Sequence, residues 1–526
     1  MKLRFIGIGS IAGAILLTVV LSVSACGRGP SEQTKMPQLQ YTVSMPDPAD
    51  HLFRIDLRCS GWDGDTVDFR MPAWMPGYYQ LMHYARSVLD FTASDSRGKA
   101  LGVIKPEENH WRIAVPRGKP FMLSYNVKAD RRFVANNYLD TTRAYLVPAA
   151  TFLFIEGQIN VPVSVKVILK EGWTDIATGL KSVPGRVNEF TAPDFNMLYD
   201  CPLLMGNLEE LPSFRINDIE HRFIAFNPGA FDRERFMAAL SRVVQAAVDI
   251  VGYIPYDLYT FIGIGPGNGG IEHLNNTTVS FNGNGLDNDA ALTRTMSFLA
   301  HEYFHNYNVK RIRPFELGPF DYTRENRTNL LWVSEGLSVY YQHMIVMRAG
   351  LSSGEDFLAS LARNIRAYEN SAGRDYQSLV QASYSTWSEG PFGNQGPDAG
   401  KSISVYDKGP IIGMILDLTI RDATNNRKSL DDVMQYLYRE YYKVRQRGFT
   451  DAEFREACEI VAGIPLAPEF EYVCNTGDID YNHYLNMAGY RLVETRSERG
   501  TREFTVSSLE TVTPIQETLR AGWLNQ

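Results

Sequence analysis

Two histidines and a glutamate stand together in the segment LAHEYFHNYNV, in a pattern that suits metal-dependent hydrolysis. The segment is helix-competent, and residues four apart on a helix share one face, so His301 and His305 can bind the same ion. Glu302 follows the first histidine and can point at a water molecule on that ion, as a general base must. The pattern therefore predicts a metal site with its own base.

A third ligand is expected thirty residues after His305, in the segment LLWVSEGLSVYYQ. Glu335 lies there in a helical pattern among apolar neighbours, where an isolated carboxylate is costly. Two histidines and one glutamate leave the fourth position of a zinc ion open for water, so we predict one zinc ion per chain. The alternative is that Glu335 is an ordinary solvated helix residue.

The residues that precede the site predict an all-β N-terminal domain over residues 41–210. Short runs such as DTVDFRM and FMLSYNVKA alternate apolar and polar residues, as half-buried strands do. The domain holds no convincing cluster of catalytic side chains. We therefore expect it to act as a scaffold or as the wall of a cleft.

A second domain is expected over residues 211–488, mainly helical with a small β portion. Apolar residues recur every three or four positions from about 231 to 251, and the strand-like YDLYTFIGIG follows. Further helices are expected at about 289–309, 329–349, 354–368 and 406–422. Capping boxes predict two more, opened by Ser429 with Asp432 and by Thr450 with Glu453. The fold class is therefore α+β, with several domains.

Length and charge narrow the possible functions. The 526 residues exceed what one hydrophobic core usually supports. The chain has 52 Lys and Arg against 60 Asp and Glu, a net charge of −8 without long single-sign runs. This balance argues against a nucleic-acid partner.

The N-terminus has the pattern of a targeting segment, with basic Lys2 and Arg4, an apolar run, and small residues before Cys26. It resembles a bacterial lipoprotein signal. The resemblance implies removal of residues 1–25, a lipid on Cys26, a polar tether over 26–40, and a membrane-anchored place in the cell envelope, in the outer membrane or periplasm of a Gram-negative cell. The alternative is an uncleaved anchor, since the apolar run is nearly long enough to span a bilayer.

Four further cysteines are compatible with disulfides in such a compartment. They are Cys59, Cys201, Cys458 and Cys474, and they allow three pairings. The short separation in sequence favours a bond between Cys458 and Cys474. Their spacing is not that of a cysteine zinc site.

Five segments of the chain carry a likeness to a known family. They are PAWMPGYY (72–79), GGIEH (269–273), HEYFHNYNVKRIRP (301–314), WVSEG (332–336) and YDKG (406–409). In these segments the sequence resembles the glycyl aminopeptidase family of thermolysin-like zinc metallopeptidases, the gluzincins. The resemblance implies an all-β domain packed on a thermolysin-like catalytic domain. It also implies removal of N-terminal Gly or Ala from peptides with a free N-terminus.

The resemblance assigns roles to further residues. Tyr406 matches a tyrosine that hydrogen-bonds the tetrahedral oxyanion, and the alternative is an ordinary buried helix tyrosine. Glu272 matches the carboxylate that binds the substrate's free amine, after the turn glycines Gly269 and Gly270, which let the backbone pass close to the substrate. The alternative places Glu272 at the surface on a strand edge, next to a solvent-exposed His273.

The sequence departs from the family pattern at two places. Tyr307 stands where the family commonly has Trp, a change that we expect to affect packing only. The family often ends in a PDZ domain, and the residues after about 480 are too few to form one. We expect residues 489–526 to be a short tail packed on the catalytic domain.

Two alternatives to an aminopeptidase remain open. A zinc endopeptidase could use the same residues, and it would also cleave peptides whose N-terminus is blocked. A noncatalytic surface lipoprotein could use the β domain to bind a partner. The intact set of both histidines with Glu302, Glu335 and Tyr406 argues against this second alternative.

Overall fold

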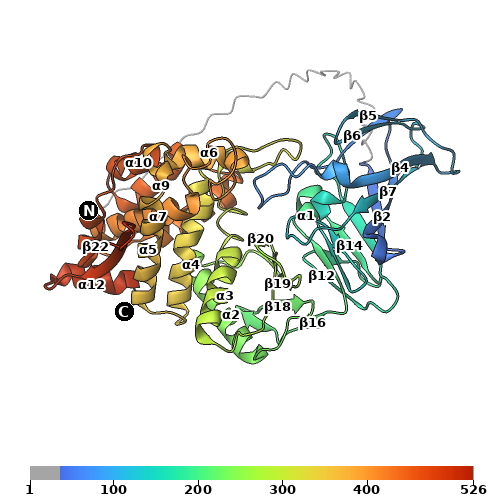
Figure 1. Ribbon diagram of the computed structural model, residues 1–526. Coiled ribbons are helices and arrows are strands. Elements are labelled where there is room, and N and C mark those ends of the chain that lie inside the picture. The colour runs from blue at the N-terminus through green and yellow to red at the C-terminus, as the bar shows by residue number, and fades with distance from the viewer. Residues whose placement is uncertain (1–35, 525–526) are drawn as a thin grey trace, which may run out of the picture. The chain divides into compact units, whose positions relative to one another are not determined.

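The structure is a computed structural model that describes residues 36–524. The predicted signal peptide, most of the predicted tether and Cys26 lie outside these residues. From Pro37 on, the chain belongs to one compact unit, in which a β-rich part is followed by a mainly helical part (Figure 1). This order confirms the predicted fold class. Among the described residues, no helix is long and apolar enough to cross a membrane.

The N-terminal strands form three sheets. They are β1 (Gln38–Ser44), β2 (Leu52–Ser60), β3 (Thr66–Arg70), β4 (Val88–Asp95), β5 (Val103–Glu107), β6 (His110–Ala114), β7 (Phe121–Lys128), β8 (Tyr138–Leu139), β9 (Arg143–Leu146), β10 (Phe154–Ile155), β11 (Val163–Ile168), β12 (Asp175–Thr178), β13 (Lys181–Ser182), β14 (Glu189–Ala192) and β15 (Leu203–Gly206). The sheet orders are β13-β14-β11-β1-β2-β7-β4, β10-β3-β6-β5 and β12-β15-β9-β8. Alternate residues of β2, such as Phe53, Ile55 and Leu57, are buried, which is the expected pattern for strands with one face on a core.

Another sheet opens the catalytic part. Its strands are β16 (Glu209–Glu210), β17 (Phe214–Ile216), β18 (Ile219–Ala225), β19 (Leu258–Gly263), β20 (Gly270–Glu272) and β21 (Asn276–Val279). The order is β16-β18-β19-β21-β20, with β17 beside β18. The helix α2 (Arg233–Val251) connects the parallel neighbours β18 and β19. The short strand β20 lies at the edge of this sheet, and it carries the predicted amine-binding segment.

The helical part has a helix within each expected range and confirms both capping boxes. Its elements are α3 (Asp289–Phe304), the π-helical turn η5 (Trp332–Gly336), α4 (Leu337–Arg348), α5 (Gly354–Glu369), α6 (Leu379–Glu389), α7 (Val405–Ala423), α8 (Leu430–Leu437), the π-helix η7 (Tyr438–Arg445), α9 (Asp451–Ala462), α10 (Ala467–Cys474) and α11 (Tyr481–Leu485). Ser429 with Asp432 opens α8, and Thr450 with Glu453 opens α9.

Two local features differ from the sequence expectations. The helix predicted over 289–309 ends at Phe304, because the chain then turns sharply and Val309 takes a φ of 135°. A β-branched residue rarely adopts this conformation. Glu335 lies in a π-helical turn instead of a regular helix. Both irregularities fall next to predicted metal ligands, where backbone irregularities often occur.

The C-terminal tail packs on the helices. The strands β22 (Tyr490–Arg496) and β23 (Arg502–Ser508) pair as a hairpin, and α12 (Pro514–Leu524) follows. Trp523 of α12 is fully buried, and its indole N–H donates to the Tyr340 hydroxyl at 2.9 Å. The last described helix is therefore part of the helical core.

The predicted disulfide between Cys458 and Cys474 is wrong, because all four cysteines in the described part of the chain are free. Cys458 lies on the buried face of α9, beside Phe454 and Ala457. Cys474 is exposed at the end of α10. The separation in sequence is short, but the two helices direct their thiols to different surroundings.

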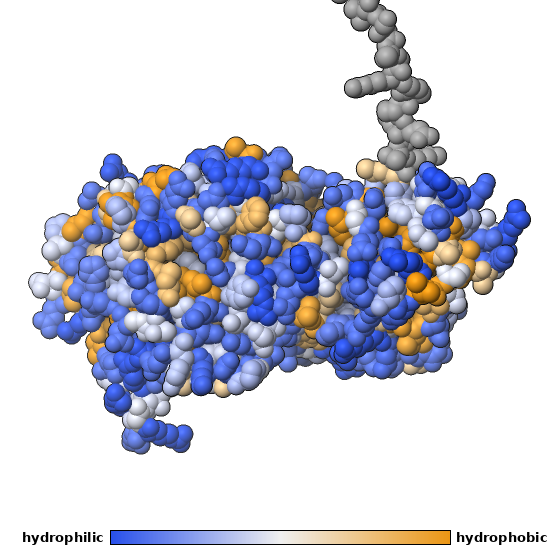
Figure 2. Space-filling view, turned by 90° about the horizontal axis from the view of Figure 1, so that it is seen from above, coloured by the Kyte–Doolittle hydropathy of each residue, from blue (hydrophilic) through white to orange (hydrophobic). Residues whose placement is uncertain are grey.

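The face of the molecule shown in Figure 2 is mostly hydrophilic, with hydrophobic residues in small separate groups. Among the large apolar side chains that are exposed, Phe392 and Tyr376 are 63% and 65% accessible. Single exposed apolar residues are normal in soluble domains. Both belong to the part of the chain between α5 and α7.

Two glycines allow η5 and α7 to cross closely. A side chain carbon added to Gly336 would lie 2.5 Å from the Cα of Gly409, and one added to Gly409 would lie 2.5 Å from the Cα of Gly336. Real Cβ atoms do not approach backbone so closely, so any side chain here would force the two elements apart. Glu335 precedes the first glycine and Tyr406 lies one turn before the second, so the crossing also sets the position of the site.

We expect Gly409→Ala to destabilise the protein, because the added methyl group must displace backbone. The loss in free energy of unfolding should be on the order of 1–3 kcal/mol, as for other overpacked cores. Gly102→Ala is the matched control, since its Cβ would meet only the Ala114 Cβ at 3.9 Å. Thermal unfolding of both variants measures the difference. Equal midpoints for the two variants would contradict the close crossing.

Candidate metal centre

Three side chains converge at the end of α3. The Nε2 atoms of His301 and His305 are 3.0 Å apart, and Glu335 Oε2 lies 3.6 Å from the first and 3.3 Å from the second. Ligand atoms about 2.0–2.1 Å from a tetrahedral zinc ion are about 3.3–3.4 Å from each other. The three separations therefore fit the edges of one zinc coordination sphere.

Asn308 orients two of the ligands. The His305 Nδ1–H donates to the Asn308 carbonyl at 2.8 Å, which leaves the lone pair of Nε2 directed at the other ligands. The Asn308 side-chain amide donates to the carbonyls of Val333 and Ser334 at 2.8 and 3.1 Å, next to Glu335. One residue thus joins the histidine helix to the π-helical turn of the glutamate.

The electrostatics favour a positive charge between the ligands. Burial opposes ionisation of Glu335, yet His305 and His301 hold the pKa of its carboxyl below the ordinary value. Burial also opposes charge on His305, but the Glu335 carboxylate raises the pKa of that imidazole to about 10. Burial, with His305 nearby, lowers the pKa of His301. A divalent cation held by two neutral imidazoles and a carboxylate would supply the charge that this arrangement favours.

Glu302 lies beside the ligands without being one of the three. Its carboxyl is buried under Gly270 of β20, where an added Cβ would lie 2.6 Å from Glu302 Cδ. Burial, with smaller effects from Glu272 and Glu335, raises the pKa of Glu302 to about 8, although His305 acts in the opposite direction. Gly270 is therefore needed to make room for this carboxyl.

The structure brings Glu272 to the same place. It is 4% exposed, and its Oε1 is buried with no hydrogen-bond partner among the described residues. A Cβ on Gly77 of the N-terminal domain would lie 2.7 Å from Glu272 Oε2, so that domain covers the carboxylate. The alternative of a surface glutamate is wrong. His273 is also fully buried, and its Nδ1 is 3.1 Å from Asp200.

The neighbouring Gly269 begins the turn into β20. It has a φ of 91°, a conformation that favours glycine, and a Cβ there would be 3.3 Å from the Val134 side chain. Of the two predicted turn glycines, Gly270 contacts a site residue and Gly269 contacts the N-terminal domain.

Two tyrosines adjoin Glu335. The Tyr406 ring lies 6.1 Å from the His301 ring, and burial followed by the Glu335 charge raises the pKa of Tyr406 well above its ordinary value. The pKa of Tyr79 is raised by burial and then by Glu335 and Glu272. Both phenols therefore stay protonated and can donate hydrogen bonds.

Sequence reasoning missed the role of Tyr79. It lies in the segment PAWMPGYY of the N-terminal domain, more than two hundred residues before the histidines. No spacing rule connects residues so far apart. The available signal was the rigid Pro-Gly turn followed by two aromatic residues, which is unusual for an otherwise alternating strand domain.

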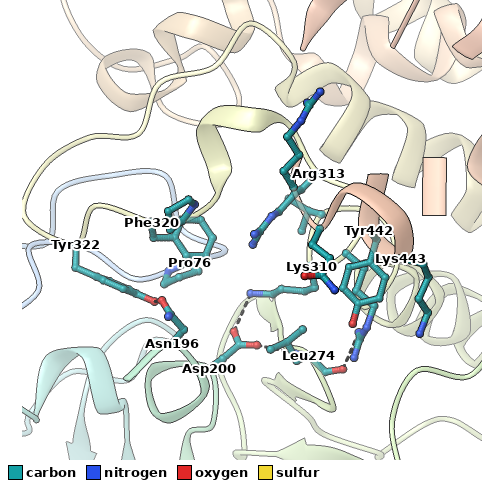
Figure 3. A pocket seen from close by; sticks show the side chains of 15 residues that line it. Pro76, Asn196, Asp200, Leu274, Lys310, Arg313, Phe320, Tyr322, Tyr442 and Lys443 are labelled. Atoms are coloured by element: carbon teal, nitrogen blue, oxygen red, sulfur yellow. Dashed lines mark hydrogen bonds and ion pairs between the residues drawn. The ribbon is translucent and has the colours of Figure 1, made fainter. Parts of the chain in front are cut away.

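A buried ion pair ties the N-terminal domain to the turn after His305. Lys310 Nζ is 2.8 Å from Asp200 Oδ1, and Asp200 Oδ2 accepts from the Leu274 amide at 2.6 Å (Figure 3). Burial opposes the charge of Asp200, but Lys310 and His273 hold the pKa of its carboxyl below the ordinary value. Breaking one side of such a pair is costly, so it fixes this part of the interface.

A second group of possible ligands in the described chain, Asp68, His110 and Glu156, does not fit a metal site as well. Asp68 already accepts from Arg112 at 2.7 Å and pairs with His110 at 2.6 Å. Glu156 accepts from Arg70 at 2.9 Å. Because these oxygens have partners, the histidine pair with Glu335 remains the metal site, which agrees with one zinc ion per chain.

The family models match two stretches of the chain. Residues 40–207 match the peptidase M61 N-terminal domain, and residues 294–412 match the M61 glycyl aminopeptidase domain. A search of curated proteins gives no match.

Solved structures share the fold. An aminopeptidase N family protein from Idiomarina loihiensis superposes with a TM-score of 0.81 at 25% identity, covering 87% of this chain and 80% of that chain. An M1 zinc metallopeptidase from Deinococcus radiodurans gives 0.51 at 13% identity, covering 84% and 92%. Aminopeptidase A from Legionella pneumophila gives 0.53 at 12% identity, covering 90% and 52%.

The two family models cover the β domain and the ligand helix together, in the order that the resemblance implied. His301, His305 and Glu335 lie within residues 294–412, the stretch that matches the M61 glycyl aminopeptidase domain, and their donor atoms have the separations of one zinc coordination sphere. The chain therefore belongs to the M61 glycyl aminopeptidase family of zinc peptidases.

Proposed function

We propose that this zinc aminopeptidase removes small N-terminal residues, Gly or Ala, from peptides with a free N-terminus. The observation that carries the proposal is the buried Glu272 carboxylate, whose Oε1 has no partner among the described residues. A free α-amine is a compact cation and provides the charge-assisted hydrogen bond that this oxygen lacks. An amine bound there places the scissile bond one residue from the N-terminus.

The crowding around Glu272 supports a small first residue. A Cβ on Gly77 would lie 2.7 Å from Glu272 Oε2 and 2.8 Å from the Ile271 side chain, so no space is left on that side of the carboxylate. Tyr79 is buried beside the same carboxylate. The relatives point the same way, because the matching family model is that of a glycyl aminopeptidase. A solved structure of an M1 zinc metallopeptidase mutant from Deinococcus radiodurans, at 14% identity and a TM-score of 0.53, is bound to a Tyr-ser-ala substrate, which supports a peptide as the substrate class but says nothing of the size of its first residue here.

The mechanism follows from the side chains around the metal centre. His301, His305 and Glu335 would hold the zinc ion, which would supply the Lewis acidity that lets water act as a nucleophile near neutral pH. Glu302 takes a proton from the attacking water and delivers it to the leaving amine. Tyr406 donates a hydrogen bond to the oxygen that becomes negative in the transition state.

We expect one zinc ion per purified chain and a specific loss of turnover in Glu302→Gln. The amide keeps the shape of the side chain but cannot take a proton, so kcat should fall on the order of 10²- to 10⁴-fold with the zinc content unchanged. Elemental analysis and steady-state kinetics measure both quantities. Glu355→Gln, an exposed site on α5, is the control and should keep wild-type turnover. A zinc-free active enzyme, or an active Glu302→Gln variant, would overturn the assignment.

Tyr406→Phe should lower kcat while zinc binding persists. Loss of one oxyanion donor costs about 2.7–4 kcal/mol, or on the order of 10²- to 10³-fold in kcat. Tyr384→Phe is the control, because Tyr384 is 50% exposed. If both variants turn over at the wild-type rate, Tyr406 only packs the core.

Glu272→Gln separates an aminopeptidase from an endopeptidase. On peptides that begin with Gly or Ala, kcat/KM should fall roughly ten- to a hundredfold, because a charge-assisted hydrogen bond is worth about 1.5–3 kcal/mol. The assay compares wild type and variant on free and N-acetylated forms of one peptide. Wild type should prefer the free form, and the variant should lose most of that preference. Equal cleavage of both forms by wild type favours the endopeptidase alternative.

We also propose that a lipid on Cys26 anchors the protein in the cell envelope. The support is the sequence pattern of a basic start, an apolar run and small residues before Cys26. Cys26→Ser should release the full chain from the membrane fraction, because the sulfur carries the lipid. Membrane association of Cys26→Ser, with residues 1–25 still present by mass spectrometry, would support the uncleaved anchor instead.

A further inference from the structure

A pocket of about 550 Å³ lies beside the buried pair of Asp200 and Lys310, and it is lined by an excess of cationic side chains (Figure 3). The cationic lining residues are Lys310, Arg311, Arg313, Lys443 and Arg447, and the one acidic lining residue is Asp200. The metal ligands do not line this pocket. Its volume suits a small ligand or the end of a peptide.

Two of the cations have acidic partners. Lys310 pairs with Asp200 at 2.8 Å, and Arg447 pairs with Glu453 through contacts of 2.5 and 2.9 Å. Their charges are therefore largely balanced, and they are poor candidates for binding a further anion.

The remaining three cations have no acidic partner among the described residues. Arg311 is 5% exposed and donates only to backbone carbonyls, those of Leu274, Asn306 and Pro255. Lys443 lies over the rings of Tyr438 and Tyr442, at 5.6 and 5.4 Å from their centroids. The pocket thus carries uncompensated positive charge.

Arg313 is the best placed of these three. Burial lowers the pKa of its guanidinium, and the ionisable groups near it are the phenols of Tyr322 and Tyr442. No hydrogen bond or ion pair joins its side chain to any described residue, and the residue lines the pocket with its guanidinium nitrogens not fully enclosed. Arg313 is half-buried, and a cation removed in part from water gains from a ligand that supplies the missing partner.

Gly318 and the Arg313 backbone define the position of this side chain at the pocket. The guanidinium lies directly against Gly318, since a Cβ there would lie 2.1 Å from Arg313 Cζ and 2.4 Å from Nη2, and any side chain at 318 would displace it from its present position. The Arg313 backbone carbonyl accepts from the Phe449 amide at 3.0 Å. The backbone of Arg313 is thus fixed beside the pocket, and its side chain is free to pair with a ligand there.

From this cavity, its charge excess and the unpartnered guanidinium, we propose that the pocket binds an oxyanion on Arg313. A guanidinium presents parallel N–H donors that match a carboxylate or a phosphate. Apolar walls from Pro76, Pro319 and Phe320 add contacts for a ligand with an apolar body. The C-terminal carboxylate of a short peptide has this chemistry, and free phosphate shares only its charged part. The assignment of the bound oxyanion to a peptide C-terminus rests on the proposed function. The presence of an anion-binding site does not.

Three probes distinguish these sources on the full-length, zinc-loaded protein. They are N-acetyl-Ala-Phe, its C-terminal amide, and inorganic phosphate, with affinities measured by calorimetry. The acetyl group removes the free amine, so the result does not depend on Glu272. We expect the carboxylate to bind at least tenfold more tightly than the amide. Tighter binding of phosphate would support the anion site and identify free phosphate as the source.

Arg313→Gln should weaken binding of the preferred anion roughly ten- to a hundredfold, as expected for loss of a charge-assisted pair. Arg58→Gln, at an exposed position on β2, is the matched control and should bind like wild type. We expect the same zinc content in both variants, so that a difference in affinity reports binding in the pocket and not loss of the metal. If Arg313→Gln does not fold, Arg313→Lys keeps the charge, loses the fork and should bind several-fold more weakly. No binding to wild type, or equal binding to the Arg58 and Arg313 variants, would overturn the proposal.

Discussion

Buried negative charge around the metal centre is the constraint on which the rest of this structure depends. Glu272, Glu302 and Glu335 are each at most 6% exposed. Of these three carboxylates, only Glu335 forms ion pairs with basic groups of the described residues, namely with His301 and His305. Carboxylates removed from water need a cation or hydrogen-bond donors, so binding of the metal and stability of this region are coupled.

Backbone contacts, more than side-chain packing, hold these charges in position. Asn308 bridges a histidine ligand to the turn that carries Glu335. Gly270 makes room for Glu302, and the contact between Gly336 and Gly409 lets η5 lie against α7. Each device acts through a backbone atom or through a missing side chain. A precise site built this way tolerates few substitutions at residues that have no chemical role themselves.

Local patterns in the sequence were sufficient to predict the three metal ligands. The four-residue interval of His301 and His305 sets their shared face, and the apolar surroundings of Glu335 indicated a buried partner. The burial of His273 and the contact of Tyr79 with the site depend on how the N-terminal domain packs, which no local pattern encodes. The free thiols of Cys458 and Cys474 have the same explanation. A short separation in sequence favoured a disulfide, but the orientation of the two helices decides whether the thiols can meet.

The wall of the metal centre is shared between the N-terminal domain and the catalytic part of the chain. Gly77 touches Glu272, Tyr79 lies near Glu335, and Asp200 is paired with Lys310 across the same junction. Neither part presents a complete cleft by itself. Chimeras that exchange the N-terminal domain between relatives must therefore transfer the Pro-Gly turn and the Asp200 contact as one module, since a mismatched junction would alter the substrate side of the cleft even with every metal ligand retained.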